Sequence, residues 1–347
     1  MKKLFLLPIV AIAFLFTGCL ENDLPYIPAP PAVMVEIIDV PIRQVEGSAA
    51  TITARVITET PEVVTSVAIE WRVGDGSPTT ATMTLANNIW TGDIPTQEDG
   101  TRVSFRAVAT VTGDEPVYSE SQTTIWTDQL AGQLLIFSAF GTGPDGGAAS
   151  SRSFVELYNT TNAVIDLDGI TLHWANSIRG PGITADEAWQ MTPLTGTIPA
   201  GGSFLILGPV RGAGTAGLVL AEGSGDINDD NLVLNNRGFK VALIRNSDQL
   251  TVQNPFTMDG TGRGIARGYI DMVGAVNNRA ATNPDNLFGY EYYPARNSGS
   301  SATRRTSLVD TDNNDADFDE VRFAEDADAR QNKFPRNSSA GSWTPTF

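Results

Sequence analysis

The chain has 347 residues, and its 23 lysines and arginines face 40 aspartates and glutamates, a formal net charge of −17. Such a negative surface repels phosphate backbones, which argues against nucleic acid as a ligand. The single cysteine, Cys19, excludes an internal disulfide, and the single histidine, His173, excludes a two-histidine metal centre. Glycine and proline are spread through the chain, and no long segment has helical apolar periodicity. We therefore predict an all-β protein of short strands joined by turns.

The N-terminus has the pattern of a secretory signal. Lys2 and Lys3 precede the apolar run from Leu4 to Phe16, which is shorter than the about 20 residues that span a bilayer. The stretch FTGC then ends in Cys19 and resembles the lipobox of bacterial lipoproteins, whose cysteine is acylated after cleavage. Residues 1–18 are thus predicted to be a lipoprotein signal peptide and Cys19 the lipidation site. The alternative is ordinary secretion with Cys19 as a bystander.

Residues 19–32 form a predicted spacer, because four prolines keep LENDLPYIPAPPA extended. The residue after the cysteine is Leu20. An aspartate there would resemble a signal for retention at the inner membrane, so we expect no retention. Glu21 and Asp23 resemble the surface-export signal of lipoproteins in the Bacteroidetes. We expect a lipid anchor in the outer membrane, with the protein facing the periplasm or the cell exterior.

Residues 33–127 alternate between apolar and polar side chains. Val67, Ile69, Trp71 and Val73 share one face, and the run from 102 to 111 alternates in the same way. Period-two alternation is typical of half-buried antiparallel strands. Weaker runs occur at 34–40, 49–57, 79–85, 88–94 and 118–126. Their spacing predicts an immunoglobulin-like or fibronectin-like β-sandwich with Trp71 in its core.

Residues 132–347 carry several motifs in a fixed order. They include FVELYN from Phe154, IDLDG from Ile165, PAGG from Pro199, IDMV from Ile270, and a Ser…Arg…Asp-Phe ending. In this order they resemble the lamin-tail domain, over about residues 132–325. The resemblance implies a second immunoglobulin-like β-sandwich, in tandem with the first. Phe239, Val241 and Leu243 are independently predicted to form one buried stripe.

The stretch DTDNNDADFDE, Asp310 to Glu320, concentrates acidic residues. It fails the EF-hand pattern, since Asp315 stands at the glycine position and Val321 at the final glutamate position. A calcium site of another shape is one interpretation. In the other, which we favour, the side chains accept backbone N–H groups in a tight turn while Arg304 and Arg305 neutralise the charge. No cofactor is then required. The candidate metal ligands are Asp310, Asp312, Asn314, Asp315 and Asp317.

The stretch NPDNLFGYEYYPARNSGS, residues 283–300, is the best candidate for a recognition loop. Tyrosine offers a rigid contact surface with a polar tip, and loops on rigid sandwiches commonly bind partners. The competing interpretation is a loop that packs its own aromatics against the sheet. The candidate contact residues are Phe288, Tyr290, Tyr292 and Tyr293.

Catalytic signatures are weak. Gly141 to Gly146 matches G-x-G-x-x-G, but a predicted strand follows where a nucleotide site needs a helix, so we expect a hairpin loop. His173, in ITLHW, is opposite Leu172 and Trp174 and is predicted to be solvent-facing or hydrogen-bonded. Residues 226–231, DINDDN, form a second acidic loop.

The sequence therefore predicts a non-catalytic, lipid-anchored binding, adhesion or scaffolding module of a bacterial envelope, whose partner is a protein or a glycan. The alternatives are a calcium-dependent or carboxylate-based extracellular hydrolase, and an accessory subunit of a separately encoded envelope enzyme. The hydrolase would need the acids at 226–230 and 310–320 to converge in one pocket.

Overall fold

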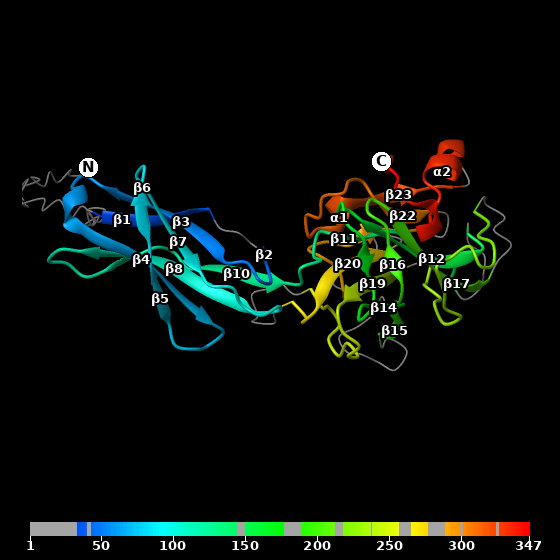
Figure 1. The fold of residues 1–347 in the computed structure, drawn as a ribbon, viewed down its shortest axis with the longest axis horizontal. Helices are drawn as coiled ribbons and strands as arrows, with labels where there is room; N and C mark the ends of the chain where they lie inside the picture. The colour runs from blue at the N-terminus through cyan, green and yellow to red at the C-terminus, as the bar shows by residue number, and fades with distance from the viewer. Residues whose placement is uncertain are drawn as a thin grey trace, which may run out of the picture.

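The computed structural model describes residues 33–39, 43–143, 150–176, 189–211, 218–236, 238–256, 265–276, 289–298, 301–323 and 326–347. The strands form two groups that follow one another along the long axis of the molecule (Figure 1). The first group comes from the N-terminal third of the chain and the second from the remainder. The prediction of an all-β sandwich fold is confirmed.

The first group consists of two antiparallel sheets, to which β2 adds a parallel edge. One sheet has the order β1 (Val33–Asp39), β3 (Ala50–Thr58), β7 (Ile89–Ile94) and β6 (Thr84–Ala86). The other has the order β2 (Arg43–Val45), β10 (Gln122–Thr127), β8 (Arg102–Val111), β4 (Val64–Val73) and β5 (Thr79–Thr82), with β9 (Val117–Tyr118) also paired to β8. A 3-10 turn, η1 (Pro61–Val63), precedes β4.

The core of the first group lies on the face that the alternation predicts. Val67, Ile69 and Phe105 are buried between the two sheets, and Trp71 packs against them while half-buried. Trp126 is buried as well, and its indole N–H donates to the Ser48 carbonyl at 2.9 Å. Trp71 therefore belongs to the core packing, as predicted.

The second group is built on two larger sheets. The first has the order β18 (Ile227–Asn228), β17 (Ser203–Val210), β12 (Arg152–Asn159), β11 (Leu134–Phe140), β22 (Ala302–Arg305) and β23 (Phe318–Val321). The second has the order β15 (Gln190–Pro193), β14 (Thr171–Ala175), β19 (Gly238–Ile244), β20 (Tyr269–Val276) and β21 (Ala295–Arg296). A small pair, β13 (Ile165–Asp166) and β16 (Thr197–Ile198), completes it.

The main core of the second group lies between these sheets. The predicted stripe of Phe239, Val241 and Leu243 is fully buried there, opposite Val155 and Leu157 of β12. The short helices α1 (Asn314–Asp317) and α2 (Ala327–Asn332) and the 3-10 turn η3 (Ser338–Ala340) lie in the C-terminal part. Within the described residues, no helix is long and apolar enough to cross a membrane.

The expectation for His173 is wrong. Its side chain does lie opposite Leu172 and Trp174, but that face of the sheet is covered by a second apolar cluster that includes Trp189 and Phe256. His173 is therefore fully buried, and neither ring nitrogen has a hydrogen-bond partner among the described residues. Alternation identified the face correctly and could not show that distant segments cover it.

Replacing this unpaired imidazole with leucine should stabilise the protein. An unsatisfied buried polar group costs about 1–3 kcal/mol, so we expect His173→Leu to raise the free energy of unfolding at pH 7.5 by about 1 kcal/mol. Burial lowers the pKa of His173 from 6.5 to about 4. At a pH between these two pKa values, His173 is protonated in the unfolded chain and neutral in the folded chain. The free energy of unfolding of the wild type therefore falls as the pH falls.

Urea unfolding at pH 7.5 and pH 5 measures both effects. His173→Gln is the matched control. It should remove the loss of stability at pH 5, but because it keeps a buried polar group it should not raise the free energy of unfolding at pH 7.5. A leucine variant that is less stable at both pH values would contradict the prediction.

Candidate functional site

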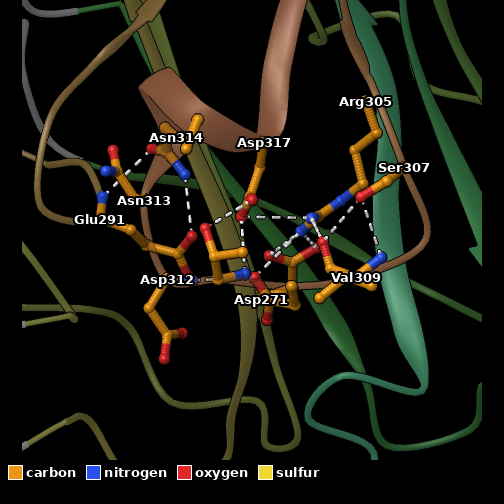
Figure 2. Close-up of polar contacts among 12 residues, drawn as sticks. Asp271, Glu291, Arg305, Ser307, Val309, Asp312, Asn313, Asn314 and Asp317 are labelled. Carbon is orange, nitrogen blue, oxygen red and sulfur yellow. Dashed lines mark hydrogen bonds and ion pairs between the residues drawn. The ribbon is translucent and has the colours of Figure 1, made fainter. Parts of the chain in front are cut away.

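The two loops that the sequence suggests as separate candidates lie together. The Asn314 backbone N–H donates to the Glu291 carbonyl at 3.1 Å, and that of Asp315 to the Tyr293 carbonyl at 3.0 Å. Figure 2 shows the side chains of Asn314 and Glu291 pointing toward one another. The aromatic loop around residue 291 and the acidic loop around residue 314 therefore form one structural unit.

Asn314 joins this unit to the sheet. Its Oδ1 accepts the N–H groups of Gly274, at 2.9 Å, and Glu291, at 3.1 Å. Its Nδ2 donates to the Met272 carbonyl at 2.9 Å and to Glu291 Oε2 at 2.8 Å. A fully buried amide with every hydrogen-bonding atom used is a structural side chain. Asn314 thereby fixes both loops on β20.

A buried cluster of acids lies beneath the loops. Asp271, Glu291 and Asp310 each bring a carboxylate oxygen within 4.8 Å of the other two. Asp271 also accepts the Ile136 backbone N–H at 2.6 Å, and Glu291 accepts the Tyr269 hydroxyl at 2.5 Å. The cluster thus combines β20 of one sheet with β11 of the other and with both loops.

Arginines balance part of this charge. Arg305 is fully buried, and its Nη2 lies 3.0 Å from both oxygens of Asp271 and 3.4 Å from Asp310 Oδ1. Its Nη1 lies 3.5 Å from Asp317 Oδ2. Arg43, from β2 of the first group, lies 3.6 Å from Asp310 Oδ2. Arg43 therefore brings a positive charge from the first group of strands to the site.

Burial sets the protonation of the cluster. Desolvation raises the pKa of Asp271 to about 7, although Arg305 opposes the shift. Desolvation and the neighbouring Asp310 and Asp271 raise the pKa of Glu291 well above its usual range. Burial thus favours the neutral form of Glu291 over its charged form.

Carboxylate oxygens at this spacing suit a hard cation such as Ca²⁺. An ion there would need Glu291 in its charged form, which burial disfavours, and would compete with Arg305 for Asp271, because metal ligands must be deprotonated. The described contacts already give all three carboxylates hydrogen-bond or ion-pair partners. The three carboxylates thus form a paired network whose spacing would also suit a cation.

The predicted metal ligands do not converge on one point. Asp310 belongs to the acid cluster, Asp312 is ion-paired with Arg43, and Asn314 is used as described above. Asp315 is exposed. Asp317 accepts the N–H and the hydroxyl of Thr311 at 2.9 and 2.6 Å.

Sequence reasoning missed Asp271 and Glu291, which lie well before the acidic stretch. An acid in the middle of the apolar strand IDMV is the one sequence signal that could have pointed to Asp271. The interpretation in which Arg304 and Arg305 both neutralise the acidic loop is half right, because Arg304 lies on the opposite face of β22 and contacts Phe137 instead.

The aromatic loop exposes one ring strongly. Tyr292 is 79% exposed, while Tyr290 and Tyr293 are half-buried. The backbone of Tyr292 has φ of +51°, which a bulky residue adopts only at a cost. Its neighbours Glu291 and Tyr293 are held by the acidic loop, so the turn directs residue 291 inward and ring 292 outward. Phe288 and Cys19 lie outside the described residues.

The second acidic loop is tied to other elements. Asp226 accepts the Leu205 N–H at 2.7 Å and the Ser338 hydroxyl at 2.5 Å. Asp229 accepts the Thr192 hydroxyl at 2.5 Å. Within the part of the chain that the structure describes, the one close group of three acids is Asp271, Glu291 and Asp310. The convergence that a hydrolase would require is not seen there.

Comparisons with known proteins leave the family open. No model of a protein family matches the chain, and no curated protein matches it. A similar solved structure is that of a DUF4876 family protein from Bacteroides thetaiotaomicron VPI-5482. It is 14% identical with a TM-score of 0.34, and the match covers 88% of this chain and 98% of that one. The lamin-tail resemblance stays a prediction.

Removing Arg305 should strongly destabilise the protein. Breaking a buried ion pair leaves an uncompensated charge, so we expect Arg305→Met to cost about 3–5 kcal/mol in the free energy of unfolding. Arg55→Met is the control, because Arg55 forms an exposed pair with Glu36 at 3.5 Å, and it should cost less than about 1 kcal/mol.

Chemical denaturation measures both variants. Adding Asp271→Asn to Arg305→Met should recover part of the loss, because the buried carboxylate is then removed as well. Similar small losses for Arg305→Met and Arg55→Met would show that the network is not structural.

Proposed function

We propose that the protein is a lipid-anchored binding module of a bacterial cell envelope, which presents the loop around Tyr292 to a protein or glycan. The observation that carries the proposal is the exposed ring of Tyr292 on a backbone held in the left-handed region. A strained conformation costs of order 1–3 kcal/mol and persists only where the surroundings impose it. Here the buried contacts of Glu291 and Asn314 impose it.

A rigid aromatic side chain suits recognition, because little conformational entropy is lost when it binds. Tyrosine is among the residues that dominate binding energy at interfaces. The negative net charge favours partners other than nucleic acid and anionic surfaces. The predicted acyl group on Cys19 and the proline spacer would hold this loop away from a bilayer.

Tyr292→Asn separates a contact role from a structural one. Asparagine tolerates positive φ, so the variant should keep or raise the melting temperature while weakening binding about tenfold or more. Binding of the labelled protein to a glycan array and to envelope extracts measures affinity. Tyr118→Asn is the control, since Tyr118 is an exposed tyrosine in the first group. Equal binding by the wild type and both variants would remove Tyr292 from the interface.

The anchor is tested separately. Cys19→Ser should move the protein from the membrane pellet to the soluble fraction, because one acylated cysteine provides the whole predicted attachment. Protease treatment of intact cells, with a periplasmic protein as the leakage control, then tests the side of the membrane. Digestion in intact cells supports surface exposure. Protection until the outer membrane is breached contradicts it.

A further inference from the structure

Arg304 and Arg305 are consecutive buried arginines in very different surroundings. Side chains alternate across a strand, so Arg305 points into the acid cluster while Arg304 points to the outer face of the same sheet. Arg304 is only 2% exposed. Of its three nitrogens, Nη1 donates to the Thr346 carbonyl at 2.8 Å, and Nε and Nη2 have no hydrogen-bond partner in the part of the chain that the structure describes.

The two unpaired nitrogens form one edge of the guanidinium. Nε and Nη2 carry parallel N–H groups, the fork that matches the two oxygens of a carboxylate. A buried guanidinium stays charged, and leaving it uncompensated is costly. Its flat face is covered by Phe137, whose ring centroid lies 4.5 Å from Cζ, and more distantly by Phe347, at 6.0 Å. A ligand that carries an anionic group next to an apolar group would fit both the edge formed by Nε and Nη2 and these two rings.

The surroundings of Arg304 offset its charge only in part, through the electrostatic attraction of Glu156. Glu156, on β12, is buried nearby, but its Oε1 accepts the Ser203 hydroxyl at 2.8 Å and the Arg336 backbone N–H at 3.1 Å. A second guanidinium, that of Arg336, stacks on Trp343 at 3.8 Å. Two cations thus face one acid on this side of the sheet.

The C-terminal residues that contact Arg304 are weakly held. We call residues 342–347 the strap. Its inner part is fixed, because Trp343 donates its backbone N–H to the Gly201 carbonyl at 2.8 Å and its indole N–H to Ser203 at 3.0 Å, and accepts the Tyr158 hydroxyl at 2.9 Å. Thr346 and Phe347 are exposed, and Phe347 is 51% exposed. Lifting them breaks the bond between Arg304 and Thr346 and leaves the Trp343 contacts intact.

We propose that Arg304 is the anchor of a binding site for a carboxylate carried next to an aromatic ring, which the ligand reaches by displacing Thr346 and Phe347 of the strap. The carboxylate takes the fork of Nε and Nη2, and the ligand's ring replaces that of Phe347 beside Phe137. The source is a small aromatic acid or the C-terminus of a peptide that ends in an aromatic residue. The site is separate from the Tyr292 loop, so the two proposals fail independently.

Titration of the full chain with 3-phenylpropionate, followed by calorimetry and ligand-observed NMR, tests the site. The neutral 3-phenylpropionamide is the matched ligand control and should bind at least tenfold more weakly. Phe347→Ala keeps Arg304 and opens the strap, and it should raise the affinity. Arg304→Lys keeps the charge but loses the fork, and it should abolish the preference for the acid over the amide.

A pH series adds a measurement that nonspecific hydrophobic binding would not change. Burial raises the pKa of Glu156 to about 7. Glu156 therefore gains a negative charge as the pH rises through about 7, and this charge repels the ligand. The other groups that face Glu156 and Arg304 are the cation Arg336 and the uncharged side chains of Ser203 and Trp343. Affinity should fall from pH 6 to pH 8 in the wild type and stay flat in Glu156→Gln.

The peptide Ac-Thr-Pro-Thr-Phe, with a free or an amidated C-terminus, distinguishes the two sources. Tighter binding of the free-acid peptide than of 3-phenylpropionate assigns a peptide ligand, and the reverse assigns a small acid. If neither the wild type nor Phe347→Ala prefers the acid to the amide, the proposal is overturned. Tyr292→Asn should leave all of these affinities unchanged.

Discussion

The ion pair between Arg305 and Asp271 connects the parts of the second group of strands. Arg305 comes from β22 of one sheet and Asp271 from β20 of the other, and Asp271 also accepts the N–H of Ile136 in β11. Both side chains are fully buried. Because a buried charge without its partner is far more costly than an exposed one, this pair constrains how the two sheets face each other. Asp310 and Asp317 are then drawn toward the same guanidinium.

The conformation of the acidic and aromatic loops depends on that ion pair. Once Asp310 and Asp317 lie against Arg305, the residues between them form a tight turn and α1, with the Asn313 side chain capping the helix. Asn314 is thereby placed where its amide bonds Gly274, Met272 and Glu291. Gly274 has room for no side chain, since an added Cβ would lie 2.0 Å from the Gly289 carbonyl. The exposed Tyr292 is thus the outer end of a chain of buried contacts that begins at β22.

Buried polar groups in this protein differ in how well they are paired, and that difference separates structural from functional candidates. Arg305 and Asn314 have several partners each and belong to the scaffold. His173 has none in the described structure, lies in an apolar cluster and reduces stability in acid. Arg304 has one partner and a free edge that is matched to a specific ligand group. The scaffold role and the binding role thus fall to adjacent residues, because alternation sends them to opposite faces of the same sheet.

The sequence by itself determined the all-β class, the inward faces of β4, β8 and β19, and most strands of the first group to within a few residues. It missed β2 and joined β5 with β6 and β9 with β10. The correct predictions follow from period-two alternation, which is a local property of the chain. The sequence also indicated that the acidic stretch is a structured turn, and Phe318 and Phe323 are indeed buried there. Only the tertiary structure brought Asp271 and Glu291 to Asp310, covered His173 with Trp189, and separated Arg304 from Arg305. Each of these depends on which distant segments pack on a given face, and burial and pairing across sheets are set by those contacts rather than by the local pattern.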